Sequence, residues 1–287
     1  TWITLNEPWC SAYLGYGMGH HAPGIADKQA EGRAVHHLNL AHGLAVRAFR
    51  ELGKPGKIGI TWNIMVYRPA TRNEKDLLAA ELATDRDSRM FTGPVCGHGY
   101  PQRFIEHSGV KIPVQPGDLE LIAAPIDFAG LNYYSEHAVA WDDTAEEHIR
   151  WVPSWQEKTD MGWPIVPQGF VRHLRWLAAE TGGIPIYVTE NGCAQKDEVQ
   201  IDEHGQKRVH DMGRIQYLRA HFQAMMQALD EGIPLKGYFL WSLLDNFEWV
   251  HGYSKRFGII YMDYNTLQRI PKDSYYYYRD VIAGYGE

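Results

Sequence analysis

IPIYVTENG, residues 184–192, is a short apolar run that ends in Glu190, and TWITLNEP, residues 1–8, ends in the same way near Glu7. Both runs are rich in β-branched residues, as strands buried on both faces are. A carboxylate at the end of such a strand is costly to bury. Barrels of alternating strands and helices place their chemistry at the carboxyl ends of the strands. The two runs therefore predict an α/β fold with Glu7 and Glu190 at one end of a parallel sheet.

Strand-like and helix-like runs alternate along the chain, which predicts parallel topology. The expected strands cover residues 2–6, 57–63, 127–132, 184–190 and 235–242. The expected helices cover about residues 31–52, 73–90, 100–107, 169–181 and 211–231, and a last one begins near 273. Residues 135–167 and 195–207 are expected to be loops, and 257–263 a hairpin-like segment. Such a sheet has two unpaired edges, so we expect one domain over residues 1–287 that is incomplete on its N-terminal side.

Composition excludes several classes of function. A net charge of −7 argues against a nucleic-acid partner, and no apolar run is long enough for a membrane span. Cys10, Cys96 and Cys193 are scattered, which favours a reducing compartment, the cytoplasm, and leaves a signal peptide ahead of Thr1 open. The histidine pairs lack zinc-site spacing and no phosphate-binding glycine pattern is present. We therefore expect no metal and no cofactor.

The carboxylate runs and several other segments resemble family 1 glycoside hydrolases, the β-glucosidase family. Besides TLNEP (4–8) and VTENG (188–192), the similar segments are GYGMGHHAPG (15–24), HHLNLAHG (36–43), GLNYYS (130–135), TDMGW (159–163) and WSLLDNFEWVHGYSKRFGIIYMDY (241–264). They occur in the family's order and cover essentially the whole chain. The last segment is the most specific.

The resemblance implies a (β/α)8 TIM barrel, of which this chain carries about five βα units, from the fourth strand onward. In the family, the preceding third supplies three strands and several sugar-binding groups. We therefore expect a partner segment, on this polypeptide or another, that completes the barrel.

The implied activity is that of a retaining β-glycosidase acting on terminal β-D-glucosyl residues, with β-galactosidase or β-fucosidase activity as a variant. The substrate is a small β-glucoside or oligosaccharide. In this mechanism two carboxyl groups lie about 5–5.5 Å apart and a covalent glycosyl-enzyme forms. The resemblance makes Glu190 the nucleophile, which stays ionised, and Glu7 the general acid/base, which holds a proton near neutral pH.

Three polar residues resemble family positions around the carboxylates. Asn6 is expected to donate to the sugar 2-hydroxyl. Tyr134 is expected to bond the nucleophile and lower its pKa, and Asn132 to lie in the same shell.

Four residues of the most specific segment are expected to bind the sugar. Trp241 resembles the platform under the ring, and Glu248 the acceptor for the 4- and 6-hydroxyls. Trp249 lies beside Glu248, and Phe257 is expected to line the same pocket. A carboxylate at Glu248 should repel a 6-phosphate.

Other interpretations stay open. From the residues alone, a solvated loop position or a salt bridge also explains a glutamate at a strand end. Because the first third of the family's chain is missing here, the chain can also be a catalytically silent or split fragment that needs the missing strands. A third interpretation is a carbohydrate-binding protein that uses its aromatic cleft. The presence of both Glu7 and Glu190 argues against a pure binder.

Overall fold

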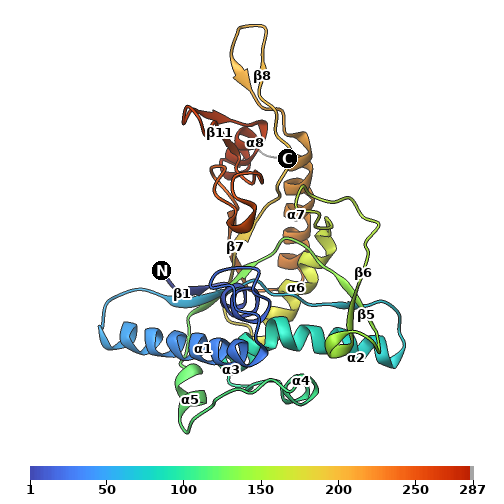
Figure 1. Ribbon diagram of the computed structural model, residues 1–287. Helices are drawn as coiled ribbons and strands as arrows, with labels where there is room; N and C mark the ends of the chain where they lie inside the picture. The colour runs from blue at the N-terminus through green and yellow to red at the C-terminus, as the bar shows by residue number, and fades with distance from the viewer. Residues whose placement is uncertain (285–287) are drawn as a thin grey trace.

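The computed structural model describes residues 1–284 and centres on a five-stranded sheet (Figure 1). The strands follow the order β1 (Trp2–Asn6), β2 (Ile58–Trp62), β4 (Phe128–Asn132), β7 (Ile186–Asn191) and β10 (Leu235–Leu240). Neighbouring strands are parallel, and helices connect them, as in the wall of a (β/α) barrel. All five predicted strands are present, with ends that differ from the prediction by at most two residues.

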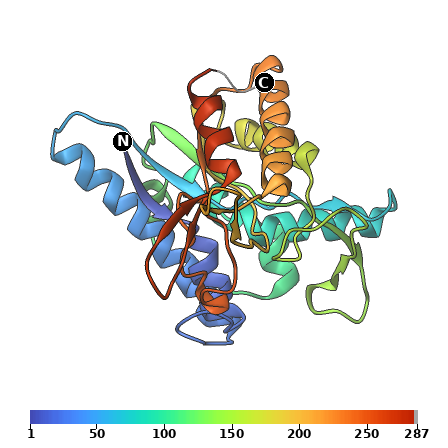
Figure 2. The same cartoon turned by 90° about the horizontal axis from the view of Figure 1, so that it is seen from above.

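Helices pack along the outer side of this sheet (Figures 1 and 2). They are α1 (Lys28–Glu51), α2 (Glu74–Thr84), α3 (Met90–Val95), α4 (Gln102–Ser108), α5 (Asp118–Ile122), α6 (Pro167–Glu180), α7 (Met212–Asp230) and α8 (Asp273–Ile282). The first begins where the Asp27 side chain accepts from the Ala30 amide at 2.5 Å. It ends just before Gly53, whose φ of +59° stops the helix. The core between the sheet and the helices includes the fully buried strands β2 and β4.

Irregular segments differ most from the prediction. The single helix predicted over residues 73–90 is divided by a π-helical turn, η2 (Asp85–Arg89), with buried charged residues. The expected loop 135–167 contains β5 (Ala138–Trp141), η3 (Glu146–His148) and β6 (Ile149–Val152), and β3 (Arg68–Pro69) extends this small sheet. The remaining elements are η1 (Cys10–Gly17), the hairpin β8 (Gln200–Ile201) and β9 (Lys207–Arg208), η4 (Trp249–His251), and the pair β11 (Ile260–Met262) and β12 (Arg269–Pro271).

Both edges of the main sheet are open. Within residues 1–284, β1 pairs only with β2, and β10 pairs only with β7. Large apolar side chains at these edges are exposed, with Trp2 at 64% and Phe239 at 59%. A hollow of about 280 Å³ beside β10 is lined by Leu240, Ile259 and Tyr278, among others. The edges therefore have both free backbone groups and apolar surface to offer another segment.

None of the helices within residues 1–284 combines the length and the apolar character that crossing a bilayer requires.

Candidate active site

The two glutamates lie at the carboxyl end of the sheet. Glu7 directly follows β1, and Glu190 is the penultimate residue of β7. The backbone of Glu7 has a φ of +48°, a conformation that costs a non-glycine residue roughly 1–3 kcal/mol. Its amide donates to the Thr61 carbonyl at 3.0 Å, and its carbonyl accepts from the Cys10 amide at 2.9 Å. The chain thus holds Glu7 in a strained conformation by bonds on both sides of the residue.

Asn132, the last residue of β4, connects the surroundings of Glu7. Its Nδ2 donates to Glu7 Oε1 at 2.7 Å and to Asn6 Oδ1 at 3.1 Å. Its Oδ1 accepts from Thr189 Oγ1 at 2.6 Å. The other carboxylate oxygen of Glu7 accepts from Cys10 Sγ at 3.1 Å. Both oxygens of Glu7 therefore have a donor.

Glu190 has its own donors. Tyr134 Oη donates to Glu190 Oε2 at 2.6 Å, and Asn6 Nδ2 donates to Glu190 Oε1 at 3.4 Å. The Tyr134 ring lies 5.4 Å from Trp163 and 5.9 Å from Phe257, between ring centroids. These aromatic contacts and the hydrogen bond fix the side chain that meets the carboxylate. Asn6 and Asn132 together form a bridge of amides between Glu7 and Glu190.

The electrostatics of this pair differ from the expectation for an ionised Glu190. Burial, and then the charge of Glu7, raise the pKa of Glu190 to about 7. The hydrogen bonds from Tyr134, Asn6 and Asn132 oppose this, as expected for Tyr134, but they do not outweigh it. The charge of Glu7 thus disfavours a second negative charge on Glu190. Glu190 therefore takes up a proton within the neutral pH range.

The predicted sugar-binding residues approach this site from the end of β10. Trp241 follows β10, and its amide donates to the Asn191 carbonyl at 3.0 Å, next to Glu190. Gly192 lies so close to the Trp241 backbone that a Cβ atom would not fit there. The pKa of Glu248 is raised by burial and by the charge of Glu7, so this side chain lies within the electrostatic field of Glu7.

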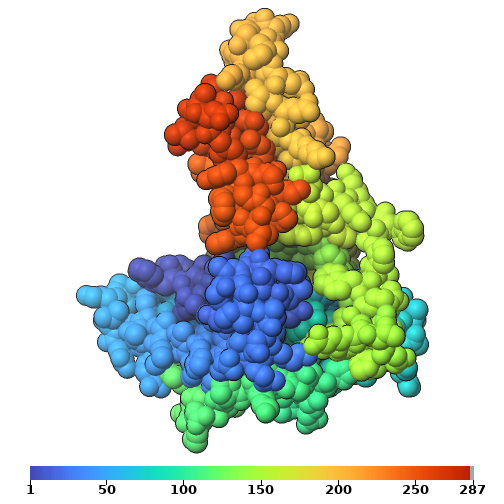
Figure 3. Space-filling view, viewed as in Figure 1, coloured from blue at the N-terminus to red at the C-terminus, as the bar shows by residue number. Residues whose placement is uncertain are grey.

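Trp249 lies at the protein surface. It is 68% exposed, and its ring stacks on His21 at 6.5 Å between centroids. Figure 3 shows the same proximity, with the orange segment near residue 250 directly on the blue segment near residue 20. The structure thus groups Asn6, Glu7, Asn132, Tyr134, Glu190 and Phe257 by direct contacts, whereas Trp249 is separate from them.

Some residues of the site were not predicted as such. Cys10 was interpreted only as a free thiol, although it comes three residues after Glu7, a spacing that a helical turn brings together. Thr189 precedes Glu190 in β7, and its hydroxyl donates to Asn132 of the neighbouring strand β4. Trp163 belongs to a segment that resembled the family, which was the available signal.

Residues 1–284 hold no group of three or more His, Cys, Asp or Glu side chains that is arranged to bind a metal ion.

The comparisons with known proteins define the class. The model of glycosyl hydrolase family 1 matches residues 1–287, and the chain belongs to this family. This confirms the resemblance and makes the sheet part of a (β/α)8 barrel. The chain is 46% identical to β-glucosidase A of Thermotoga maritima over 287 residues, with 99% of this chain and 64% of the relative covered.

Two further proteins are similar to it. A bifunctional β-D-glucosidase/β-D-fucosidase of Bifidobacterium breve is 42% identical, again covering 99% of this chain and 64% of the relative. A solved structure of the Thermotoga maritima β-glucosidase in complex with deoxynojirimycin matches with a TM-score of 0.94 at 45% identity, covering 100% of this chain and 64% of that one. The chain therefore spans slightly less than two thirds of the length of these relatives.

Proposed function

We propose that this chain carries the catalytic centre of a retaining β-glucosidase. The observation that supports this best is the pair Glu7 and Glu190, bridged by Asn6 and Asn132 at the ends of β1 and β7. Double displacement needs one protonated and one ionised carboxyl group, and the charge of Glu7 disfavours a second negative charge on Glu190. The names of the relatives supply the sugar configuration.

In the first step, Glu190 attacks the anomeric carbon while Glu7 donates its proton to the glycosidic oxygen. The bond from carbon to the leaving group breaks, and a glycosyl ester forms on Glu190. The ester carries no negative charge, so the repulsion between the two carboxylates disappears. In the second step, Glu7 takes a proton from water, the water oxygen attacks the anomeric carbon, and Glu190 leaves as a carboxylate. Two inversions give net retention.

The remaining roles concern the sugar itself. Asn6 donates to the 2-hydroxyl, a contact that strengthens in the transition state. Trp241 forms the platform under the ring, and Glu248 accepts from the 4- and 6-hydroxyls. Phe257, with its contact to Tyr134, and Trp249 complete the pocket. Both a glucoside and a fucoside fit this arrangement through the 2-hydroxyl contact, which they share.

The open edges support a second part of the proposal. A further segment with parallel strands, on this polypeptide or another, pairs with β1 and β10 and covers Trp2 and Phe239. The denatured intact mass of an active preparation tests this. A species heavier than 32.8 kDa, or a second polypeptide, supports a completed barrel. An active preparation with a single 32.8 kDa species contradicts the need for a further segment.

The cysteines support cytoplasmic activity. Cys10, Cys96 and Cys193 are all free thiols in the structure. Cys10 in addition donates to Glu7, so its oxidation removes a hydrogen bond from the proposed acid/base.

Stereochemistry tests the function as a whole. Proton NMR of the first product released from an aryl β-glucoside should show the β-anomer of glucose before mutarotation. An α-anomer as the first product would contradict a retaining mechanism, and absence of hydrolysis would favour the silent or binding alternatives.

Tyr134→Phe should slow glucoside hydrolysis and shift its pH dependence. The lost hydrogen bond to a charged group is worth about 1.5–3 kcal/mol, which corresponds to a kcat/KM about 10- to 150-fold lower. Because Tyr134 lowers the pKa of Glu190, its loss raises this pKa further above about 7. A protonated Glu190 cannot attack, so the acidic limb of the kcat/KM profile moves to higher pH. The matched control is Tyr133→Phe, whose hydroxyl donates to the Val166 carbonyl instead; identical limbs in both variants would contradict the role.

A 6-phosphorylated β-glucoside should be a poor substrate. In this proposal Glu248 accepts from the 6-hydroxyl, and its carboxylate would repel a phosphate there. Since like charges in contact cost several kcal/mol, we expect kcat/KM at pH 8 at least about 100-fold below that for the unmodified glucoside. Glu248→Gln should narrow this ratio, because it lowers kcat/KM for the unmodified glucoside and raises kcat/KM for the phosphorylated one. Equal kcat/KM for the two substrates with the unaltered protein would show that Glu248 does not contact the 6-position.

A further inference from the structure

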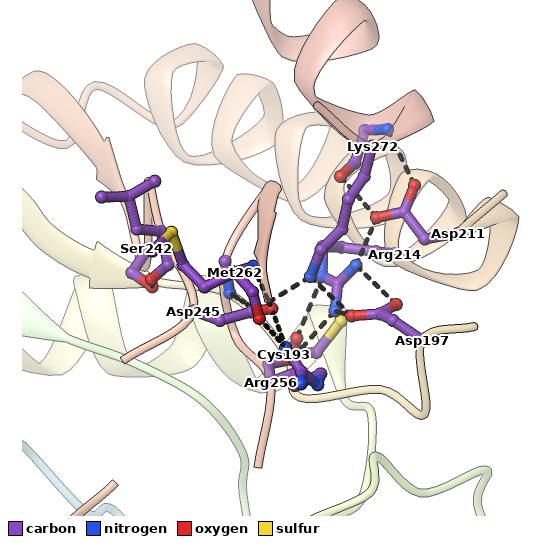
Figure 4. A network of polar contacts seen from close by, with 12 residues as sticks. Cys193, Asp197, Asp211, Arg214, Ser242, Asp245, Arg256, Met262 and Lys272 are labelled. Atoms are coloured by element: carbon purple, nitrogen blue, oxygen red, sulfur yellow. Dashed lines mark hydrogen bonds and ion pairs between the residues drawn. The ribbon is translucent and has the colours of Figure 1, made fainter. Parts of the chain in front are cut away.

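A buried network of charged side chains lies beside the segment that carries Trp241 and Glu248 (Figure 4). We call this set the ion network; it consists of Asp197, Asp211, Arg214, Asp245, Arg256 and Lys272. Three carboxylates face three cations, so their formal charges cancel. All but Arg256 have side chains that are at most 1% exposed. Such a network is costly to bury and stable only while it is complete.

Asp245 cross-links the segment that follows β10. Its Oδ1 accepts from Lys272 Nζ at 2.9 Å and from the Gly258 amide at 3.0 Å. Its Oδ2 accepts from Arg256 Nη1 at 2.6 Å and from the Met262 amide at 3.2 Å. The Asp245 carboxylate therefore bonds to Arg256, Gly258 and Met262, which follow it in the chain. It also bonds to Lys272, at the start of α8.

Lys272 and Arg214 extend this cross-link to the loop after β7. Lys272 Nζ donates to Asp197 Oδ2 at 2.5 Å, and Arg214 Nη2 donates to the same oxygen at 3.0 Å. Arg214 also donates to the Cys193 carbonyl at 3.3 Å and to the Arg256 carbonyl at 2.9 Å. Cys193 comes three residues after Glu190. The ion network thus fixes the loop that follows the proposed nucleophile relative to the segment that binds the sugar.

The segment that carries Glu248 needs the contacts of the ion network to hold its position. Between residues 246 and 254, the side chains of Phe247, Trp249 and Tyr253 are more than half exposed. The backbone amide of Glu248 bonds to the Gly252 carbonyl at 2.6 Å, which is within the same segment. Asp245, three residues before Glu248, is completely buried as a side chain. Burial and the charge of Arg214 lower the pKa of Lys272, and Asp197 and Asp245 oppose this.

We propose that Lys272 is a positioning residue for sugar binding: through Asp245 it holds residues 241–256 so that Glu248 faces the sugar ring. This inference rests on the proposed β-glucosidase function and adds a residue that does not contact substrate. Its effect falls on glycone affinity, because Asp245 lies in the segment that carries Glu248, whereas Asp197, in the loop after the nucleophile, keeps its bond to Arg214 when Lys272 is replaced.

Lys272→Met tests the proposal in the active protein. It removes one cation and leaves Asp197 paired with Arg214, and Asp245 paired with Arg256. For an aryl β-glucoside, we expect KM to rise at least about 10-fold while kcat stays within about 3-fold, the pattern of lost uniform binding. On a Glu248→Gln background the same change should raise KM less than about 3-fold, because residues that act through one contact are not additive. Backbone amides of Gly258 and Met262 should also exchange hydrogen faster in the Lys272→Met variant.

Two further variants separate positioning from loss of stability. Lys272→Met with Asp245→Asn removes one charge of each sign, so a folded protein is expected with the same rise in KM. Arg103→Met is the matched control, since it removes one of two cations from the buried Asp85 and leaves Arg89, away from the β7 and β10 loops. This control should lower Tm without changing KM.

The outcomes are distinguishable. If the unaltered protein does not hydrolyse β-glucosides, the proposed function fails, and this inference fails with it. If the unaltered protein is active but both Lys272 variants keep its KM, the inference alone is overturned. A rise in KM that persists in full on the Glu248→Gln background also overturns it, because Lys272 then does not act through Glu248.

Discussion

Glu190→Ala should abolish turnover of an aryl β-glucoside, lowering kcat on the order of 10⁵-fold or more, as loss of a nucleophile does in other enzymes. The variant keeps the general acid but has no carboxylate to attack the anomeric carbon. It also leaves a space where a small anion fits. Azide should therefore restore cleavage of a substrate with a good leaving group, and the product should be the α-glucosyl azide, which is inverted.

Glu190→Gln is the control for this experiment. Glutamine keeps the volume of the side chain and can still accept from Tyr134, but it is not an effective nucleophile. Azide should not rescue it, because no space is opened. A β-configured azide product from the Glu190→Ala variant would contradict the assignment of Glu190 as nucleophile.

The loss of activity in Glu7→Gln should depend on the leaving group of the substrate. A dinitrophenolate leaves without protonation, so formation of the glycosyl-enzyme from dinitrophenyl β-glucoside should be nearly unchanged. Alkyl glucosides and disaccharides need the proton, and their kcat/KM should fall about 10²–10⁴-fold, the usual contribution of general acid catalysis. The measurements are kcat/KM for both classes of substrate and the pre-steady-state burst, which reports the formation of the glycosyl-enzyme.

The second step of the mechanism, hydrolysis of the glycosyl-enzyme, distinguishes Glu7→Gln from Glu190→Ala. Without Glu7 as base, water reacts slowly with the glycosyl-enzyme, whereas azide needs no base. Azide should accelerate turnover and give the β-glucosyl azide, opposite in configuration to the product of Glu190→Ala. An equal loss on both classes of substrate would show that Glu7 does not act as the acid.

The sequence predicted the sheet well because each strand is a local apolar run with turn residues after it. Both glutamates come at the ends of such runs, so the topology alone brings them to one end of the sheet. The π-helical turn at Asp85–Arg89 was not predictable in this way. Its buried charges pair with residues of other elements, as Asp85 does with Arg103, and such pairing leaves no periodic signal.

The electrostatics of the site were the least predictable. The expectation that Glu190 stays ionised considered the hydrogen bond from Tyr134, which is present. The pKa of about 7 results from burial and from the proximity of Glu7, two quantities that exist only in the folded chain. The ion network also exists only in the folded chain, since Asp197 and Lys272 are 75 positions apart and meet through the packing of α8.

The two glutamates have a consequence for the direction of the amide bridge. An ionised carboxylate only accepts, so Glu7 requires the nitrogen of Asn132, and the Asn132 oxygen then faces the Thr189 hydroxyl. Asn6 then presents its oxygen to Asn132 and its own nitrogen to Glu190. If either amide flipped, a carbonyl oxygen would face a carboxylate. The two carboxylates therefore set the polarity of the bridge from its two ends, and the Thr189 hydroxyl, which can donate or accept, adapts to it.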